Sequence, residues 1–347
     1  MGIASWTTKV LRNKKEVLAL EPPRRKTLLW HVTNRCNQSC KYCYGSFGGC
    51  SYRAQNRVWR DVPLRKLLQA ADDLSSLGFE RAYVCGGEPF LRDDIWPLLS
   101  RLKKDNVECF VLSNLTFIPK GFERQFARNT MTGLAFSLDS IDIEYNDWIR
   151  GNTITVMSNI REVLRMKAKY GVSTELGLYS VITKKGLRYL DPLIDWAADA
   201  GLDYVSLQLV YLPTDHPYHD QLTVTSEQRE EVMAVLRHLR ELGGRCRVPG
   251  DTYFELNHQL LLVGDLCAVN CFCEREPRYL FVDGNGNVRQ CPCKHKQPGH
   301  LVGNIREKRL TEMEMPLGSE GIVCSELSPD CLGVWEMAHP RVGPQRH

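Results

Sequence analysis

Along most of the chain, short runs of apolar residues alternate with longer stretches in which apolar and polar residues follow the helical period. Short apolar runs rich in branched and aromatic residues predict strands near 27–33, 81–85, 107–112, 132–138, 173–181 and 203–210. Amphipathic stretches between them predict helices over 64–77, 93–104, 121–128, 156–170 and 189–200. Several of these helices run into a glycine, which is typical of a helix C-terminus, as at Gly78, Gly171 and Gly201.

This order of elements predicts an α/β architecture. Six strand–helix repeats favour parallel strands covered by helices, and the count fits a partial (β/α)6 TIM-like barrel. After a further helix over 226–242 the alternation stops, and the remainder predicts a small cysteine-rich α+β domain. We therefore expect an N-terminal extension over 1–25, a partial barrel over 26–242 and a second domain over 243–347.

Charge and composition narrow the functional classes. The 347 residues carry 45 Lys and Arg against 41 Asp and Glu, a net charge of +4 that is too small to indicate nucleic acid or an anionic membrane as a partner. No run of 18 apolar residues occurs, and the N-terminus lacks the regions of a signal peptide. The 14 cysteines are clustered, which without a signal peptide favours metal binding over disulfides and predicts a cytoplasmic protein.

Three cysteines lie within eight residues directly after the first predicted strand. Cys36, Cys40 and Cys43 form a CxxxCxxC motif. Three thiolates are one fewer than the four that close a structural zinc site or a complete iron–sulfur cage. A [4Fe–4S] cluster bound here would keep one iron open to another ligand. A zinc knuckle is the alternative.

The motif resembles the signature of radical S-adenosylmethionine (SAM) enzymes. The resemblance implies that the three cysteines hold a [4Fe–4S] cluster and that SAM chelates its fourth iron through amino and carboxylate groups. Reductive cleavage of SAM would then give methionine and a 5′-deoxyadenosyl radical, with an electron donor such as flavodoxin or ferredoxin. Tyr42, just before the last cysteine, is expected among the residues that contact the cofactor. The resemblance also implies the partial barrel.

A second motif, Gly86-Gly87-Glu88-Pro89, directly follows a predicted buried strand. Two glycines remove side chains where a ligand must approach the backbone, and Pro89 favours an extended Glu88. Strand-edge carbonyls and an outward-facing carboxylate would suit a ligand ammonium. In the family, this element binds the SAM amino group. The alternative is an ordinary strand-to-helix turn.

Further candidates follow other predicted strands, because chemistry in βα barrels lies at the carboxyl ends of the strands. Ser113 and Asn114 follow the third strand, and Ser137 begins a Ser-x-Asp turn after the fourth. Arg150 resembles the family's arginine near the SAM carboxylate, which an arginine fork can bind at two points. Gln208 ends the sixth strand, where the family meets adenine. Each could instead lie in a surface turn or a helix cap.

The C-terminal part resembles the auxiliary-cluster domains called SPASM, with two clusters, and twitch, with one. Apolar runs around Asp283–Gly286 predict a hairpin. We expect one four-cysteine iron–sulfur cage from Cys273, Cys291, Cys324 and Cys331. The other nearby cysteines make the ligand set ambiguous, and the spacing Cys324-x6-Cys331 departs from the usual closing CxxC. Zinc is the alternative metal.

The substrate is less well defined than the chemistry. Many enzymes with auxiliary clusters modify peptides and carry a recognition domain before the cysteine loop, but only 35 residues precede the loop here. We therefore expect a small polar substrate, a sugar, cyclitol or nucleoside intermediate of natural-product biosynthesis, that undergoes dehydrogenation or decarboxylation. The alternatives are a peptide maturase and, in another class, a non-catalytic zinc or iron–sulfur scaffold. The loop after the sixth strand supplies substrate-binding candidates, namely Tyr211, His216, Tyr218 and His219.

Overall fold

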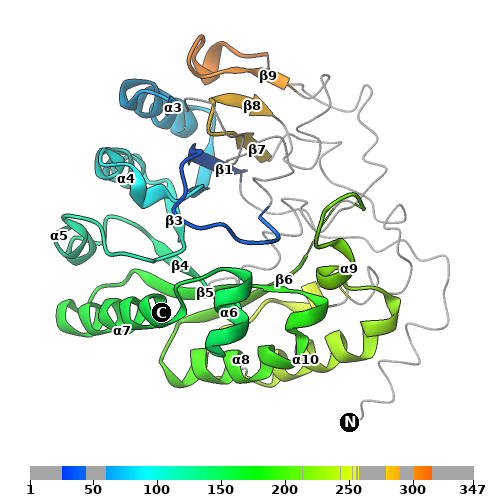
Figure 1. Ribbon diagram of the computed structural model, residues 1–347. Coiled ribbons are helices and arrows are strands. Elements are labelled where there is room, and N and C mark those ends of the chain that lie inside the picture. Colours follow the sequence, from blue (N-terminus) through cyan, green and yellow to red (C-terminus); the bar gives the residue numbers. More distant parts are fainter. Residues whose placement is uncertain are drawn as a thin grey trace.

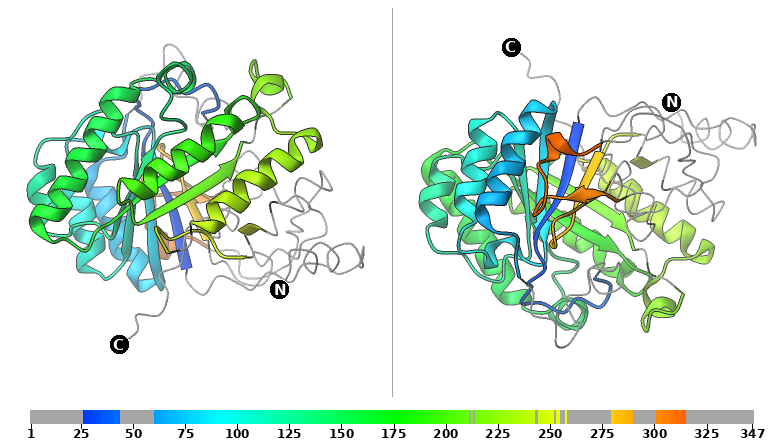
Figure 2. Two further views of the ribbon diagram at one scale, coloured as in Figure 1. Left: turned by 90° about the horizontal axis from the view of Figure 1, so that it is seen from below. Right: turned by 90° about the horizontal axis from the view of Figure 1, so that it is seen from above.

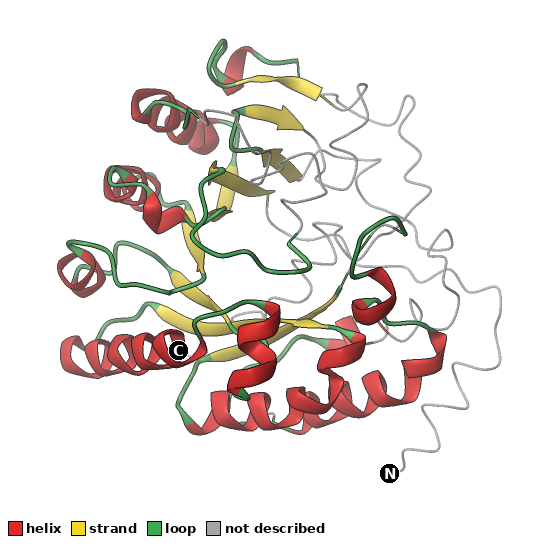
Figure 3. Ribbon diagram, viewed as in Figure 1, coloured by secondary structure: helices red, strands yellow, loops and turns green. Residues whose placement is uncertain are grey.

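A computed structural model describes residues 26–43, 60–210, 212, 214–242, 244–251, 253–254, 257, 279–289 and 301–314. Six parallel strands form its centre: β1 (Lys26–Thr33), β2 (Phe79–Gly86), β3 (Glu108–Ser113), β4 (Gly133–Ser137), β5 (Glu175–Ile182) and β6 (Tyr204–Leu209). Neighbouring strands in the chain are neighbours in the sheet. The sheet curves, and the helices cover its convex side (Figures 1 and 3). The predicted partial barrel is confirmed.

The helices fill the connections between the strands. They are α3 (Leu64–Ser76), α4 (Ile95–Lys104), α5 (Phe122–Ala127), α6 (Ile143–Ile149), α7 (Thr153–Tyr170), α8 (Leu190–Asp199), α9 (His219–Leu222) and α10 (Arg229–Glu241). The sequence-based prediction missed α6 and α9 and began α7 three residues too late. Among the described residues, no helix combines the length and apolar character needed to cross a membrane.

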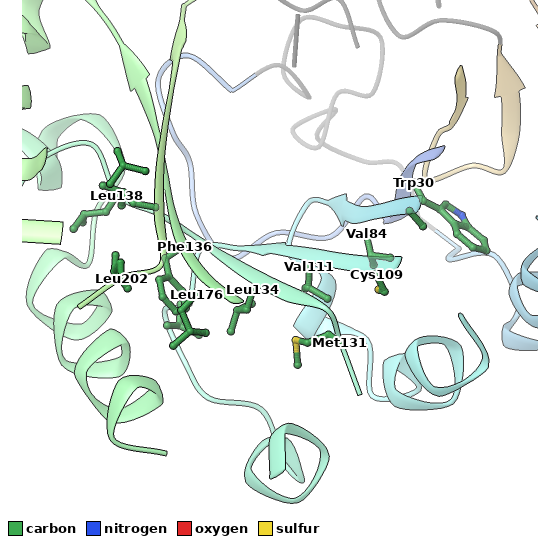
Figure 4. Packing of buried hydrophobic residues seen from close by; sticks show 14 of the residues in the cluster. Trp30, Val84, Cys109, Val111, Met131, Leu134, Phe136, Leu138, Leu176 and Leu202 are labelled. Atoms are coloured by element: carbon green, nitrogen blue, oxygen red, sulfur yellow. The ribbon is translucent and has the colours of Figure 1, made fainter. Parts of the chain in front are cut away.

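The two faces of the sheet bury different side chains. Outward-pointing residues such as Trp30, Val84 and Leu134 form the large apolar core beneath the helices (Figure 4). Because side chains alternate along a strand, the residues between them point to the inside of the barrel. There a Cβ atom at Gly177 would lie 2.1 Å from the ring of Tyr204, so the glycine makes room for the buried tyrosine. Aromatic rings therefore fill this part of the interior.

The C-terminal hairpin continues the same sheet. β7 (Tyr279–Val282) pairs in parallel with β1, and β8 (Asn287–Arg289) and β9 (Leu301–Asn304) add antiparallel strands beyond it. The predicted hairpin and antiparallel region are thus confirmed, as extensions of the barrel sheet. Figure 2 shows these strands beside β1. The division of the chain at residue 243 stays a prediction.

Side-chain contacts fix this extension to the barrel. The buried carboxylate of Asp73 in α3 accepts hydrogen bonds from the side chain of Arg309 and, at 2.9 Å, from the amide of Leu310. At the hairpin turn, the side-chain amide of Asn34 donates to the side-chain oxygen of Asn285 at 3.1 Å. Asn34 lies just before the cysteine loop, so the hairpin contacts the start of that loop.

Candidate active site

The cysteine motif lies in the loop after β1, beyond the carboxyl ends of the strands (Figure 2). All three cysteines are partly buried. The loop is fixed to the end of α6, because the amide of Lys41 donates to the carbonyl of Ile149 at 3.0 Å and the side chain of Gln38 donates to the carbonyl of Gly151 at 3.1 Å. The fold thus places the motif where a βα barrel carries its chemistry.

The two glycines after β2 allow this loop to approach closely. The amide of Gly87 donates to the carbonyl of Thr33 at 2.9 Å, and a Cβ atom on Gly87 would lie 2.0 Å from the carbonyl oxygen of Arg35. Gly86 has a φ of 132° and would place a Cβ atom 2.4 Å from the Thr33 oxygen. The described structure therefore gives these glycines a further role, since the backbone of the cysteine loop itself approaches them, and the predicted approach of a ligand stays a prediction.

The carboxylate of Glu88 is buried, so the predicted outward orientation is wrong. Its oxygens accept hydrogen bonds from the Ser113 hydroxyl at 2.9 Å, the Asn114 amide at 2.7 Å and the Phe90 amide at 3.0 Å. Burial raises the pKa of this carboxyl to about 7 despite these donors. Pro89 begins a short 3-10 turn with an extended Glu88 before it, as predicted. Glu88 therefore joins the ends of β2 and β3.

Asn114 extends this network to the cysteine loop. Its side-chain amide donates to the side-chain oxygen of Asn37 at 2.9 Å and points to the sulfur of Cys36 at 3.9 Å. Ser113, by contrast, uses its hydroxyl on Glu88. Of these two predicted residues, Asn114 thus contacts the cysteine loop directly. Ser113 instead donates its hydrogen bond to the Glu88 carboxylate, which in turn binds the Asn114 amide.

A second buried carboxylate, Asp139, lies on the other side of the loop. It accepts hydrogen bonds from the hydroxyl of Tyr42, from Nε of Arg150 at 2.8 Å and from the amide of Val181 at 2.9 Å. Sequence reasoning selected Ser137 from this Ser-x-Asp turn, yet the structure gives the central position to Asp139. The acidic residue of that turn was the available signal.

Arg150 contacts both this carboxylate and a cysteine. Its guanidinium donates through Nε to Asp139, and its Nη1 lies 3.6 Å from the sulfur of Cys40. The guanidinium also lies 5.4 Å from the centre of the Tyr42 ring. Because Nε is engaged by Asp139, the predicted two-point contact with a SAM carboxylate would use Nη1 and Nη2, and it stays a prediction.

The donor set of the loop fits an iron–sulfur cluster. Burial raises the pKa of Cys36 to about 12 and that of Cys40 to about 11, and nearby sulfur charges contribute to both shifts. Metal binding must therefore displace protons from these thiols. In the parts of the chain that the structure describes, no three His, Cys, Asp or Glu side chains lie close enough to share one metal ion. A [4Fe–4S] cluster does not require the three thiolates to share one ion, because each thiolate binds a different iron.

The loop after β6 reaches the cysteine motif through Tyr218. The ammonium of Lys41 lies 3.3 Å from the Tyr218 hydroxyl. His216 and His219 make local contacts, in which Nδ1 of His216 accepts from the Tyr218 amide and Nδ1 of His219 lies 3.1 Å from the Leu212 carbonyl oxygen. Gln208, in β6, is partly exposed on the inner face. Outside the described residues lie Tyr211, Cys273, Cys291, Cys324 and Cys331.

Comparisons with known proteins agree with this geometry. Residues 30–183 match the family model of the Radical SAM superfamily. The chain is 25% identical to mycofactocin maturase MftC of Mycolicibacterium smegmatis over 283 residues, 80% of this chain and 67% of that protein. It is 22% identical to Fe-coproporphyrin III synthase of Methanosarcina barkeri, over 65% of this chain and 54% of that protein.

A solved structure shares the fold. Streptococcus suis SuiB bound to S-adenosylmethionine superposes with a TM-score of 0.61 and 15% identity, over 84% of this chain and 66% of that chain. The chain thus spans about half to two thirds of the length of these three proteins. The superfamily match covers the cysteine loop and the strands around it, and the protein is a radical SAM enzyme.

Proposed function

We propose that the protein uses SAM radical chemistry to modify a peptide. The main support for radical chemistry is the position of Cys36, Cys40 and Cys43. These three partly buried thiols lie at the carboxyl edge of a partial barrel. The buried carboxylates Glu88 and Asp139 support them from two sides. When bound, a [4Fe–4S] cluster supplies the electron that cleaves SAM to methionine and a 5′-deoxyadenosyl radical.

The chain's own residues would orient SAM beside this loop. Backbone carbonyls near Gly86 and Gly87 are the candidates for the SAM amino group. The Glu88 carboxylate supports that backbone, since it accepts three hydrogen bonds from its surroundings. The further proposed SAM contacts are Tyr42, Pro89, Ser113, Asn114, Ser137, Arg150 and Gln208. The loop with Tyr218 is the proposed substrate side, because it contacts Lys41 within the motif.

The peptide class rests on the relatives. MftC is named as a maturase and matches 80% of this chain, and a second SuiB structure, bound to its precursor peptide SuiA, has a TM-score of 0.63. These findings favour a peptide over the small polar substrate that we predicted from the sequence. A non-peptide substrate is the second candidate, because the chain also matches a coproporphyrin synthase.

An auxiliary cluster completes the proposal. The β7–β8 hairpin, predicted as part of a twitch or SPASM-like domain, is present and joins the barrel sheet. We place the auxiliary cage on Cys273, Cys291, Cys324 and Cys331. The electron donor would be a flavodoxin or ferredoxin in a reducing cytoplasm, where these thiols stay available for metal.

Anaerobic reconstitution tests the radical chemistry. Reconstituted protein given SAM and dithionite should form 5′-deoxyadenosine, and Cys36→Ala should abolish its formation. Cys246→Ala is the matched control, because Cys246 is also a free cysteine, here a buried one, and lies outside the motif. Normal 5′-deoxyadenosine formation in Cys36→Ala would overturn the assignment.

A separate assay tests the substrate class. Extract of the host cell, passed through a filter that retains proteins, is added to the reconstituted enzyme with SAM. If the substrate is a peptide, the extract should accelerate 5′-deoxyadenosine formation, and protease treatment of the extract should remove the acceleration. Acceleration that survives the protease would instead support a small molecule.

A further inference from the structure

Arg150 lies between the cysteine loop and a buried acid. Its Nη1 is 3.6 Å from the sulfur of Cys40, and its Nε donates to Asp139 at 2.8 Å. The Arg150 side chain is 10% exposed and that of Asp139 is 1% exposed. This ion pair is therefore shielded from water, and its charges act on nearby groups with less screening than at the surface.

The surrounding contacts hold Arg150 in one orientation. Asp139 is fixed by the Tyr42 hydroxyl and by the amide of Val181. The ring of Tyr42 lies against the guanidinium. The backbone carbonyl of Gly151, the next residue, accepts a hydrogen bond from Gln38 in the cysteine loop. The side chain thus cannot turn away from Cys40 without breaking contacts on both sides.

The geometry points to a role for this pair beyond binding SAM: we propose that Arg150, positioned by Asp139, raises the reduction potential of the cluster held by Cys40. The inference rests on the proposed cluster. An N–H donor at a ligand sulfur stabilises the reduced cluster, which carries more negative charge than the oxidised one. The pair acts as a dipole whose positive end faces the sulfur and whose negative end lies farther away.

If the Arg150–Asp139 pair acts as a dipole, removing its two ends should shift the midpoint potential in opposite directions. General disruption of the site would not produce opposite shifts. Loss of the positive end in Arg150→Gln should shift the midpoint potential of the cluster to a more negative value. Loss of the negative charge in Asp139→Asn should shift it to a more positive value. The double variant Arg150→Gln/Asp139→Asn removes both charges and should lie between the wild type and Arg150→Gln.

The test is a redox titration of the reconstituted protein without SAM, followed by electron paramagnetic resonance. The Cys36/Cys40/Cys43→Ala triple variant, titrated beside it, identifies signals from the auxiliary site. Arg81→Gln is the matched control, since Arg81 is a mostly buried arginine paired with Glu108 at the opposite end of the strands and should leave the potential unchanged. Iron per chain is measured for every variant.

The outcomes separate this inference from the proposed function. Opposite shifts for Arg150→Gln and Asp139→Asn support it. Unchanged potentials, or shifts in the same direction, overturn it while leaving the radical chemistry intact. If Arg150→Gln does not fold, the charge-neutral double variant replaces it, and a potential equal to that of the wild type overturns the inference. A wild-type protein that lacks the motif's cluster signal would instead refute the proposed function itself.

Discussion

Gly87 and Arg35 belong to different loops, yet a Cβ atom on Gly87 would lie 2.0 Å from the Arg35 carbonyl oxygen. The amide of the next residue, Glu88, donates to that same oxygen at 2.8 Å. The loop after β2 and the loop that carries the cysteines are therefore in direct backbone contact. The site depends on this contact, because Arg35 immediately precedes Cys36.

We expect Gly87→Ala to displace the cysteine loop. The obstructing atom is backbone and cannot turn away as a flexible side chain could. The variant should lose about 1–3 kcal/mol of unfolding free energy and bind less iron on reconstitution. Gly250→Ala is the control, because no atom lies within 4 Å of the position of its Cβ atom. Full iron binding by Gly87→Ala would show that the two loops can separate without harm.

Glu88 gives the protein a pH-dependent stability. Burial raises its pKa from 4.5 to about 7, so between these values the folded chain holds a proton that the unfolded chain has released. The Glu88 contribution is therefore most favourable below pH 4.5 and falls as the pH rises towards about 7. The loss across this window is on the order of 3 kcal/mol.

Urea unfolding at about pH 5 and about pH 8 measures this contribution. The wild type should lose more stability over this interval than Glu88→Gln, which cannot titrate. Glu80→Gln, a change at an exposed glutamate, should behave as the wild type does. An equal pH dependence in the wild type and Glu88→Gln would contradict the prediction.

The Tyr42 hydroxyl should support the loop through Asp139. Tyr42→Phe removes one donor from a buried carboxylate, while Arg150 and Val181 still donate to it. We expect a loss of about 1–3 kcal/mol in unfolding free energy. Tyr170→Phe is the control, because Tyr170 makes its hydrogen bond to Glu123 at the surface. Equal stability of the two variants would argue that Tyr42 acts only through its ring.

The sequence predicted the strands well because each carries a continuous buried run. It could not predict α6, a short helix that side-chain hydrogen bonds to the flanking turns hold in place. Asn146 within it accepts hydrogen bonds from the amides of Asp139 and Ser140 and donates to Thr153. Such contacts leave no periodic pattern in seven residues.

The same limit explains the error at Glu88. The Gly-Gly-Glu-Pro motif identified Glu88 as a candidate, and Pro89 predicted its extended backbone. The donors that enclose the carboxylate come from Ser113 and Asn114, which lie on a different strand end and enter only with the tertiary fold. Asp139 was passed over for a similar reason, because its importance lies in the partners that surround it.

The auxiliary site can be tested by metal content. With one radical SAM cluster and one auxiliary cluster, the reconstituted protein should contain about eight irons per chain, and the Cys36/Cys40/Cys43→Ala variant about four. Cys324→Ala should also lose iron but should keep the first cluster and its 5′-deoxyadenosine formation. The two sites are separable in this way because their proposed ligands are different cysteines.

Zinc and iron must be counted together, with Cys246→Ala as the control for loss of a buried thiol. About four irons with one zinc would make the C-terminal site structural, since four thiolates also suit zinc. Unchanged iron in Cys324→Ala would remove this residue from the ligand set. About twelve irons would require a second auxiliary cluster, and the seven C-terminal cysteines would then have to share eight positions with another ligand.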